Sequence, residues 1–300
     1  MRDTDWIILD ELHKNPNITK VAAKLYITQP TLTKRLQAME EEFQVRIVNR
    51  STKGVEFTPE GEFLAGRARI FLSFMKETVR GVDAFKTSGC GTVRLASSFT
   101  FSRRQLAEIL MAYKSAHPNI SFEIQNLRSH ELTRLVEEGE ADGAFVRGNY
   151  EGGINRCLVL REQAYAISRD PIALEELPDL PMLHCRLSNY SRRLLDSWWQ
   201  RNFRRPPSIG ATAEDVDTCC QLACRGLGYT LSFMTEEQLK NLGVHSLLLK
   251  DADGRPLVRE TWFVYDGRRA KPDYVTAFIG FVEERYSIQY AILLRRADWL

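Results

Sequence analysis

The sequence predicts an α/β protein with a small, mainly helical N-terminal part and a larger part built on an open sheet. Three observations lead to this prediction. Apolar residues recur at helical spacing through most of the first 88 residues. Strand-like and helical runs alternate from residue 92 onward, as in open α/β sheets. The length of 300 residues also favours more than one domain, because single cores rarely grow beyond about 250–300 residues.

Composition narrows the class of protein. With 44% apolar and 27% charged residues, the chain can form packed cores. No run approaches the roughly 18 apolar residues of a membrane helix, and the acidic start at 1–6 is unlike a signal peptide. Six cysteines in 300 residues are too few for a disulfide scaffold. We therefore expect a globular cytoplasmic protein with reduced thiols and no membrane contact.

The net charge of +2, from 41 basic and 39 acidic residues, argues by itself against a nucleic-acid-binding protein. The charge is unevenly distributed, however. Eight basic and three acidic residues lie between Lys14 and Lys53, so this segment carries +5. A solvated polar face is the ordinary explanation of such a run. Its position in the local structure decides whether it binds an anion.

The first sixty residues predict short helices joined by tight turns. A first helix ends near Lys14, Thr19 can cap a second, and Thr28 can cap a third that carries a buried apolar stripe. The exposed face of this third helix contains Gln29, Pro30, Thr31, Thr33, Lys34 and Arg35. These hydrogen-bonding and basic groups suit the major groove of DNA.

A β-hairpin is predicted after the third helix. Strands at 45–48 and 55–57 would be joined by the turn 49–54. Arg50, Ser51 and Lys53 lie in this turn, where they could contact the DNA backbone or minor groove.

A long helix is predicted to follow from the cap Thr58, with Pro59 at its first position. Its apolar residues alternate by three and four from Leu64 to Val82. A helix of this length and apolar character needs a partner, which is either its own domain or a second copy. Ser73 and Lys76 match the Ser-x-x-Lys pattern of some acyl-enzymes, but companion motifs are missing.

These residues resemble the winged helix-turn-helix of LysR-type transcriptional regulators. The resemblance rests on segments in the family's order and spacing, namely 22–25, 28–33, 36–40, 49–54 and 57–61. Two departures concern the packing of the wing: Gln44 replaces a usual glycine, and Val48 replaces a usual phenylalanine.

The resemblance implies a DNA-binding domain at 1–59, a linker and dimerisation helix at 60–88 and an effector-binding domain at 92–300. The last would be a periplasmic-binding-protein-like pair of lobes, one at 92–161 and 268–300 and the other at 162–267. It also implies double-stranded DNA as a partner, a homodimer or tetramer, and a small-molecule effector. In the family, the effector alters DNA bending and contact with RNA polymerase.

Ligands of open α/β sheets bind beyond the carboxyl ends of strands. The turn after the strand 92–96 also resembles the place where the family binds effector carboxylates. Predicted effector-binding residues follow three strands or lie near the starts of two later helices, of which the second is predicted at 213–225. They are Ser97, Ser98, Phe99, Thr100, Arg128, Ser129, Arg147, Ser191 and Thr212. We expect a small anionic metabolite. Capping hydroxyls and solvated arginines are the alternative explanation.

Other chemistries have little support in the sequence. The five histidines are dispersed, and apart from the isolated Ser-x-x-Lys match no catalytic, metal or cofactor motif occurs, so we expect no enzyme and no cofactor. Cys219, Cys220 and Cys224 lie close together on one predicted helix, which leaves a thiol redox-sensing regulator as an alternative. A small-molecule-binding α/β protein with a purely structural N-terminal module is another.

Overall fold

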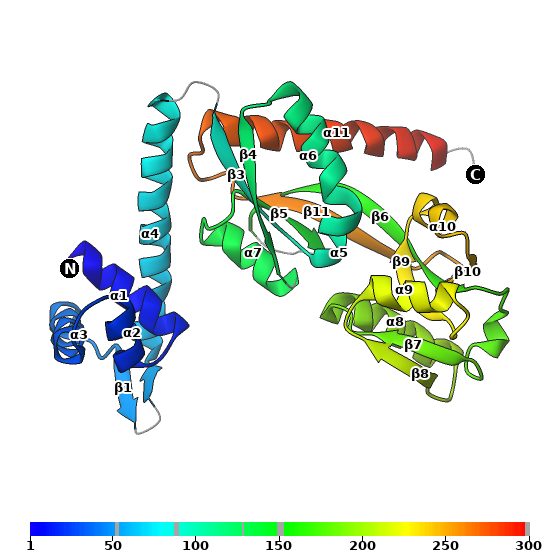
Figure 1. The fold of residues 1–300 in the computed structure, drawn as a ribbon, viewed down its shortest axis with the longest axis horizontal. Coiled ribbons are helices and arrows are strands. Elements are labelled where there is room, and N and C mark those ends of the chain that lie inside the picture. The colour runs from blue at the N-terminus through cyan, green and yellow to red at the C-terminus, as the bar shows by residue number, and fades with distance from the viewer. Residues whose placement is uncertain (52–53, 87–89, 128, 149–152, 298–300) are drawn as a thin grey trace. The chain divides into compact units, whose positions relative to one another are not determined.

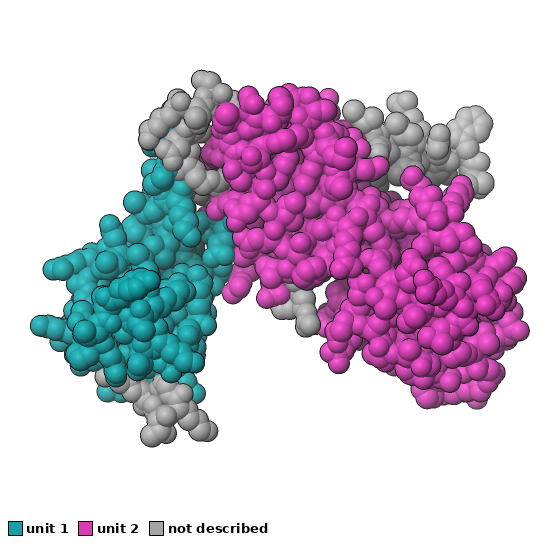
Figure 2. Space-filling model, in the orientation of Figure 1, with its two compact units in different colours: residues 1–88, 138–140 teal, residues 89–137, 141–300 magenta. Residues whose placement is uncertain are grey.

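The computed structural model describes residues 1–51, 54–86, 90–127, 129–148 and 153–297. For 50–51, 54, 77, 80–81, 83–86, 129–130 and 287–297 it describes the backbone alone. The chain forms two compact units, one made of 1–88 with 138–140 and the other of 89–137 with 141–300 (Figure 2). No helix among the described residues is long and apolar enough to cross a membrane.

The N-terminal unit consists of helices, a hairpin and one long helix: α1 (Asp3–Lys14), α2 (Ile18–Lys24), α3 (Gln29–Phe43), β1 (Val48–Ser51), β2 (Gly54–Phe57) and α4 (Pro59–Lys86). Its core forms because the apolar faces of α1 to α3 pack together around Leu9, Leu32 and Leu36, which are fully buried. Thr28 caps α3 as predicted, by accepting a hydrogen bond from the Thr31 amide at 3.4 Å.

Two local predictions in this unit were wrong. Asn17 rather than Thr19 caps α2, because its Oδ1 accepts the Lys20 amide at 3.0 Å. The first strand of the hairpin runs at 48–51 instead of 45–48. The reason is that the Ile47 and Val48 amides donate to Oε1 of Glu40, at 2.8 and 3.3 Å, so the preceding segment turns around the end of α3.

Helix α4 begins as predicted, with the Thr58 hydroxyl accepting the Gly61 amide at 3.0 Å. One side of the helix buries Leu64 and Ala68 against the rest of the unit. On the remaining surface, large apolar side chains are exposed: Phe63, Ile70, Phe74, Met75, Val79 and Val82. The helix is therefore only partly covered by its own unit.

The second unit is built on a sheet ordered β10-β6-β11-β5-β3-β4, with β9 also paired to β6. The strands are β3 (Gly91–Ser97), β4 (Ile120–Asn126), β5 (Gly143–Arg147), β6 (Asn155–Ser168), β9 (Thr230–Met234), β10 (His245–Leu248) and β11 (Val258–Tyr265). A separate parallel pair is formed by β7 (Pro181–Cys185) and β8 (Ser208–Ala213). The long strands β6 and β11 run through both lobes of this unit (Figure 1).

Helices cover the strands of both lobes. They are α5 (Phe99–Phe101), η1 (Ser102–Leu106), α6 (Ala107–Ala116), α7 (Ser129–Glu137), η2 (Leu174–Glu176), α8 (Asn189–Asn202), α9 (Val216–Cys224), α10 (Glu236–Leu242) and α11 (Asp273–Ala297). The first lobe has an aromatic core, in which Tyr113 meets Phe278 edge to face at 5.1 Å. The second lobe packs around Trp198, Tyr229 and Phe233.

Two further element predictions are corrected in this unit. The runs 158–160 and 164–167 belong to the single strand β6. The helix predicted from Ala213 begins at Val216, because the Asp215 carboxylate accepts the Thr218 amide at 3.2 Å and caps it there. Thr212 therefore lies in β8 rather than at the start of a helix.

Candidate functional site: the exposed start of α3 and a buried arginine cluster

The N-terminal end of α3 presents small polar groups to solvent. Gln29, Pro30, Thr31 and Lys34 are exposed, and Thr33 is half-buried. Two contacts order this end: the Thr28 and Thr31 hydroxyls lie 2.8 Å apart, and Thr19 Oγ1 donates to Gln29 Oε1 at 3.4 Å. The preceding turn and the cap therefore hold the start of α3 in a defined position, as a helix that enters the major groove requires.

Arg35 differs from the other predicted DNA-binding residues on α3. Its Nη2 lies 2.8 Å from Oδ1 of Asp5 and donates to Oγ1 of Thr4 at 2.9 Å. Asp5 is buried in α1, so this guanidinium ties α3 to α1. For Arg50 and Ser51 only the backbone in β1 is described, and Lys53 lies outside the described residues.

The predicted effector residues begin where the parallel strands of the first lobe end. Ser97 at the end of β3 is in register with Asn126 of β4 and Phe145 of β5. Ser98 caps α5 by accepting the Phe101 amide at 3.4 Å, so part of its hydrogen-bonding capacity is used locally. Ser97 is buried, Phe99 is exposed and Thr100 is half-buried. Arg128 lies outside the described residues, and Ser129 is described by its backbone alone.

Arg147, the last residue of β5, belongs to a buried polar cluster with Glu162, Ser191 and Arg259, which we call the Arg147 cluster. Arg259 and Glu162 face each other in the β11–β6 ladder, and Arg259 Nη2 donates to Glu162 Oε2 at 2.6 Å. Arg147 Nη2 lies 3.8 Å from Glu162 Oε1. Ser191, in the first turn of α8, accepts from Arg259 Nη1 at 3.2 Å. The cluster thus joins strands of the first lobe and the crossover to a helix of the second.

The charges of the Arg147 cluster do not balance. Its two guanidinium groups face one carboxylate, and all three side chains are at most 7% exposed. Among the described residues, Nε and Nη2 of Arg147 and Oε1 of Glu162 have no hydrogen-bond partner. A buried cation without full pairing is costly unless an anion joins it. The cluster therefore carries one surplus positive charge and free hydrogen-bond donors.

The pKa values of the Arg147 cluster follow from this arrangement. Burial, and then the neighbouring Arg259, lowers the pKa of Arg147 to about 9, while Glu162 opposes the change. Burial acts to raise the pKa of Glu162, but the charges of Arg259 and Arg147 outweigh it, so this pKa is lowered. Both groups are therefore charged at neutral pH.

Two arginines of η1 connect the lobes beside the Arg147 cluster. Arg103 Nη1 lies 3.1 Å from Asp215 Oδ1, and Arg104 Nε donates to Asp217 Oδ1 at 2.9 Å. The charges of Arg104 and Asp217 are near enough to shift the pKa of Arg147, in opposite directions. Because the two pairs are balanced in charge, they leave the surplus of the Arg147 cluster unchanged.

The structure brings together only some of the predicted effector residues. Arg147 and Ser191 share the Arg147 cluster, whereas Thr212 is exposed on β8 and pairs with His184 in the β7–β8 register. Sequence reasoning missed Glu162 and Arg259, because they lie within strands rather than at strand ends. The signal that could have pointed to them is a pair of adjacent opposite charges inside each strand, Arg161 with Glu162 and Arg259 with Glu260.

The cysteines predicted as an alternative sensor are dispersed around α9. Cys219 packs beside Cys185 in one apolar cluster, and Cys220 lies in another. Burial raises the pKa of Cys220 to about 11 and that of Cys185 to about 12, which disfavours the reactive thiolate. Cys224 is half-buried. Within the described part of the chain, no group of three or more His, Cys, Asp or Glu residues could hold a metal ion.

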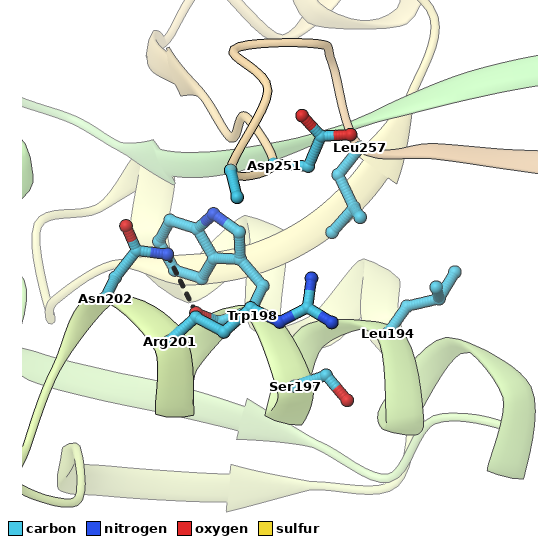
Figure 3. Close-up of a pocket in the computed structure, with 8 residues that line it drawn as sticks. Leu194, Ser197, Trp198, Arg201, Asn202, Asp251 and Leu257 are labelled. Carbon is cyan, nitrogen blue, oxygen red and sulfur yellow. Dashed lines mark hydrogen bonds between the residues drawn. The ribbon is translucent and has the colours of Figure 1, made fainter.

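A surface hollow of about 260 Å³ lies elsewhere in the second lobe (Figure 3). Trp198 forms one wall, and the amide of Asn202 donates to the Trp198 carbonyl at 2.8 Å. Asp251 and Leu257 approach from the opposite loop. None of the predicted site residues lines it, and its charged groups are at the surface, so the Arg147 cluster is the better candidate for an effector site.

Comparisons with known proteins agree with this architecture. The family model described as bacterial regulatory helix-turn-helix protein, lysR family, matches residues 4–62, and the LysR substrate binding domain matches residues 86–287. The uncharacterized HTH-type transcriptional regulator YraN of Bacillus subtilis is 30% identical, over 94% of this chain and 98% of its own length. The regulator CysL of the same organism is 24% identical, over 91% of this chain and 94% of its own length.

Solved structures show the same fold. The crystal structure of CbnR, a LysR family transcriptional regulator, has a TM-score of 0.65 at 16% identity and covers 95% of this chain and 99% of its own. CbnR complexed with its target DNA has a TM-score of 0.64 at 16% identity with the same coverage. The predicted winged helix-turn-helix and two-lobed α/β domain are confirmed. The chain belongs to the LysR family, and it is a DNA-binding transcriptional regulator with an effector-binding domain.

Proposed function

We propose that this regulator responds to a small anion bound at the Arg147 cluster, and that it acts by binding without catalysing a reaction. The observation that carries the proposal is the surplus positive charge of a buried cluster in which Nε and Nη2 of Arg147 have no hydrogen-bond partner among the described residues. A carboxylate would supply the missing charge and accept from both nitrogens, the bidentate geometry that arginine favours.

The position of the Arg147 cluster supports a regulatory role. Arg147 comes from the first lobe, Ser191 from the second, and Arg259 and Glu162 from the crossover strands. An anion held there would contact groups of both lobes and so favour one arrangement of the lobes over another. The hydroxyls of Ser98 and Thr100, beyond the end of β3, are candidates for additional hydrogen bonds to the same ligand.

For the DNA-binding part we propose that Gln29, Pro30, Thr31, Thr33 and Lys34 face the major groove, and that Arg50, Ser51 and Lys53 contact the backbone beside it. Arg35 would act by holding α3 against α1. The exposed apolar surface of α4 supports a homodimer formed through this helix, and two such dimers would give a tetramer.

The effector proposal is tested on the full-length protein by thermal unfolding with a panel of mono- and dicarboxylates, inorganic phosphate and sulfate at equal ionic strength. Calorimetric titration then measures the affinity of each anion that raises Tm. Arg147→Gln should weaken binding by roughly 10- to 100-fold, because it removes charged hydrogen bonds. The matched control is Arg161→Gln, which changes a half-exposed arginine on β6 next to Glu162.

Equal affinity of wild type and Arg147→Gln for an anion that binds would contradict the proposed site. Binding of neutral or cationic metabolites, with no response to any anion, would contradict the proposed class of effector.

A further inference from the structure

Tyr26, in the turn between α2 and α3, has an unusual conformation and an unusual exposure. Its φ is +56°, in the left-handed region, and the residue is 97% exposed. Aromatic residues rarely adopt this conformation, which costs roughly 1–2 kcal/mol relative to ordinary backbone. No burial of the ring offsets this cost, so the folded protein alone gives no reason for a tyrosine here.

The turn itself needs only a residue that tolerates positive φ. Its hydrogen bonds are made by the backbone, from the Tyr26 amide to the Ala23 carbonyl at 3.2 Å and from the Ile27 amide to the Ala22 carbonyl at 3.0 Å. Glycine or asparagine would form the same turn with less strain. The tyrosine side chain is therefore not required for the geometry of the turn.

Gln44 provides an internal comparison. It is the other described non-glycine residue with positive φ, at +54°, and lies at the C-terminal end of α3. The Gln44 side chain has a local partner, because its Nε2 donates to the Glu41 carbonyl at 2.6 Å. No described contact of this kind involves the Tyr26 hydroxyl.

The position of Tyr26 indicates which partner its hydroxyl group can bind. It lies two residues before the cap Thr28 and three before Gln29, at the end of α3 that presents the DNA-reading groups. Exposed Lys20 on α2 adds a positive charge to this side of the unit, whereas the charge of Lys24 is paired with Glu11. Tyrosine hydroxyls are among the groups that hydrogen-bond phosphate oxygens in protein–DNA complexes.

We propose that the Tyr26 hydroxyl donates a hydrogen bond to a backbone phosphate of the bound DNA and so fixes the register of α3 in the major groove. The inference rests on DNA binding by α3 and is independent of the effector proposal. A phosphate contact carries no sequence information, so it should strengthen binding to every duplex. A neutral donor also releases no counterion, so the dependence of affinity on salt should stay unchanged.

The test uses full-length protein and fluorescence anisotropy on two labelled duplexes, one recovered by in vitro selection with the wild type and one of random sequence and equal length. Tyr26→Phe removes only the hydroxyl, and Tyr26→Asn removes the ring while relieving the strained backbone. Both variants should lose about 10-fold in affinity for each duplex, with an unchanged salt slope. Tyr26→Asn should retain or raise Tm. The control Gln44→Asn should bind both duplexes like the wild type.

Wild-type affinity of Tyr26→Phe would overturn the proposal, whatever Tyr26→Asn does, since the hydroxyl would then be unnecessary. A loss confined to the selected duplex would also overturn it, because it would indicate contact with bases. Because Tyr26→Phe keeps the ring, the test stands even if Tyr26→Asn folds poorly.

Discussion

The end of α3 that we propose to read DNA and the Arg147 cluster are both polar, but the chain assembles them in different ways. The proposed DNA-contacting groups lie within one or two helical turns, from Gln29 to Lys34, and all are exposed except half-buried Thr33. The members of the Arg147 cluster lie up to 112 positions apart in sequence. They come together only when β11 pairs with β5 and β6, and when Ser191 of α8 contacts Arg259. Surface groups can therefore change with little effect on folding, whereas each buried charge depends on its partners.

The largest expected effect of this difference is on stability. Glu162→Gln leaves the guanidinium groups of Arg147 and Arg259 buried without their carboxylate, which should cost about 3–5 kcal/mol of unfolding free energy. The matched change Glu260→Gln, in a more exposed pair with Arg161, should cost about 1 kcal/mol or less. Urea denaturation of the full-length protein measures both. Equal costs for the two variants would show that the Arg147 cluster is not a buried, interdependent set of charges.

A smaller effect is expected within α3 itself, where neighbouring cations have different roles. Arg35→Ala removes the ionic partner of the buried carboxylate of Asp5 and should lower the unfolding free energy by about 1–3 kcal/mol. Lys34→Ala should leave stability unchanged within about 0.5 kcal/mol but reduce the salt slope of DNA binding by about 1. Thermal unfolding and anisotropy titrations at several salt concentrations separate the two. The reverse pattern would place Arg35, and not Lys34, at the DNA.

The smallest expected effect is a dependence of stability on acid pH. The pKa of Glu162 is lowered in the folded protein, so its ionised form contributes stability that is present above the unfolded-state pKa. This contribution should be lost as pH falls through the lowered, folded-state value. The test compares the urea midpoints of the two proteins from pH 6 downward. The wild type should lose more stability than Glu162→Gln over this range. Parallel curves for the two proteins would remove Glu162 as the source.

Much of the N-terminal unit could be predicted from the sequence because its signals are local. Thr28 caps the helix that carries the reading groups, and the stripe of Leu32, Leu36 and Met39 fixes which face is buried. The start of the wing could not be predicted, because it depends on hydrogen bonds that the Glu40 carboxylate accepts from backbone amides seven and eight residues away.

The proposed effector site could be predicted only in part. Arg147 was found because strand ends of open sheets commonly bind ligands, and a strand end can be recognised in sequence. The pairing of Glu162 with Arg259 depends on the register of two crossover strands 97 residues apart, which no local pattern encodes. Thr212 was chosen on the expectation that a helix begins beside it, but the Asp215 cap moves that start to Val216.

The central claim is that a surface-exposed DNA-reading helix is regulated through a buried, positively charged effector site. The most direct test is the affinity of full-length wild type and Arg147→Gln for the selected duplex, with and without the carboxylate that most raises the wild-type Tm. We predict equal affinities without the anion, a shift of affinity on adding it to the wild type, and no shift in Arg147→Gln. An equal response of both proteins to the anion would contradict the account.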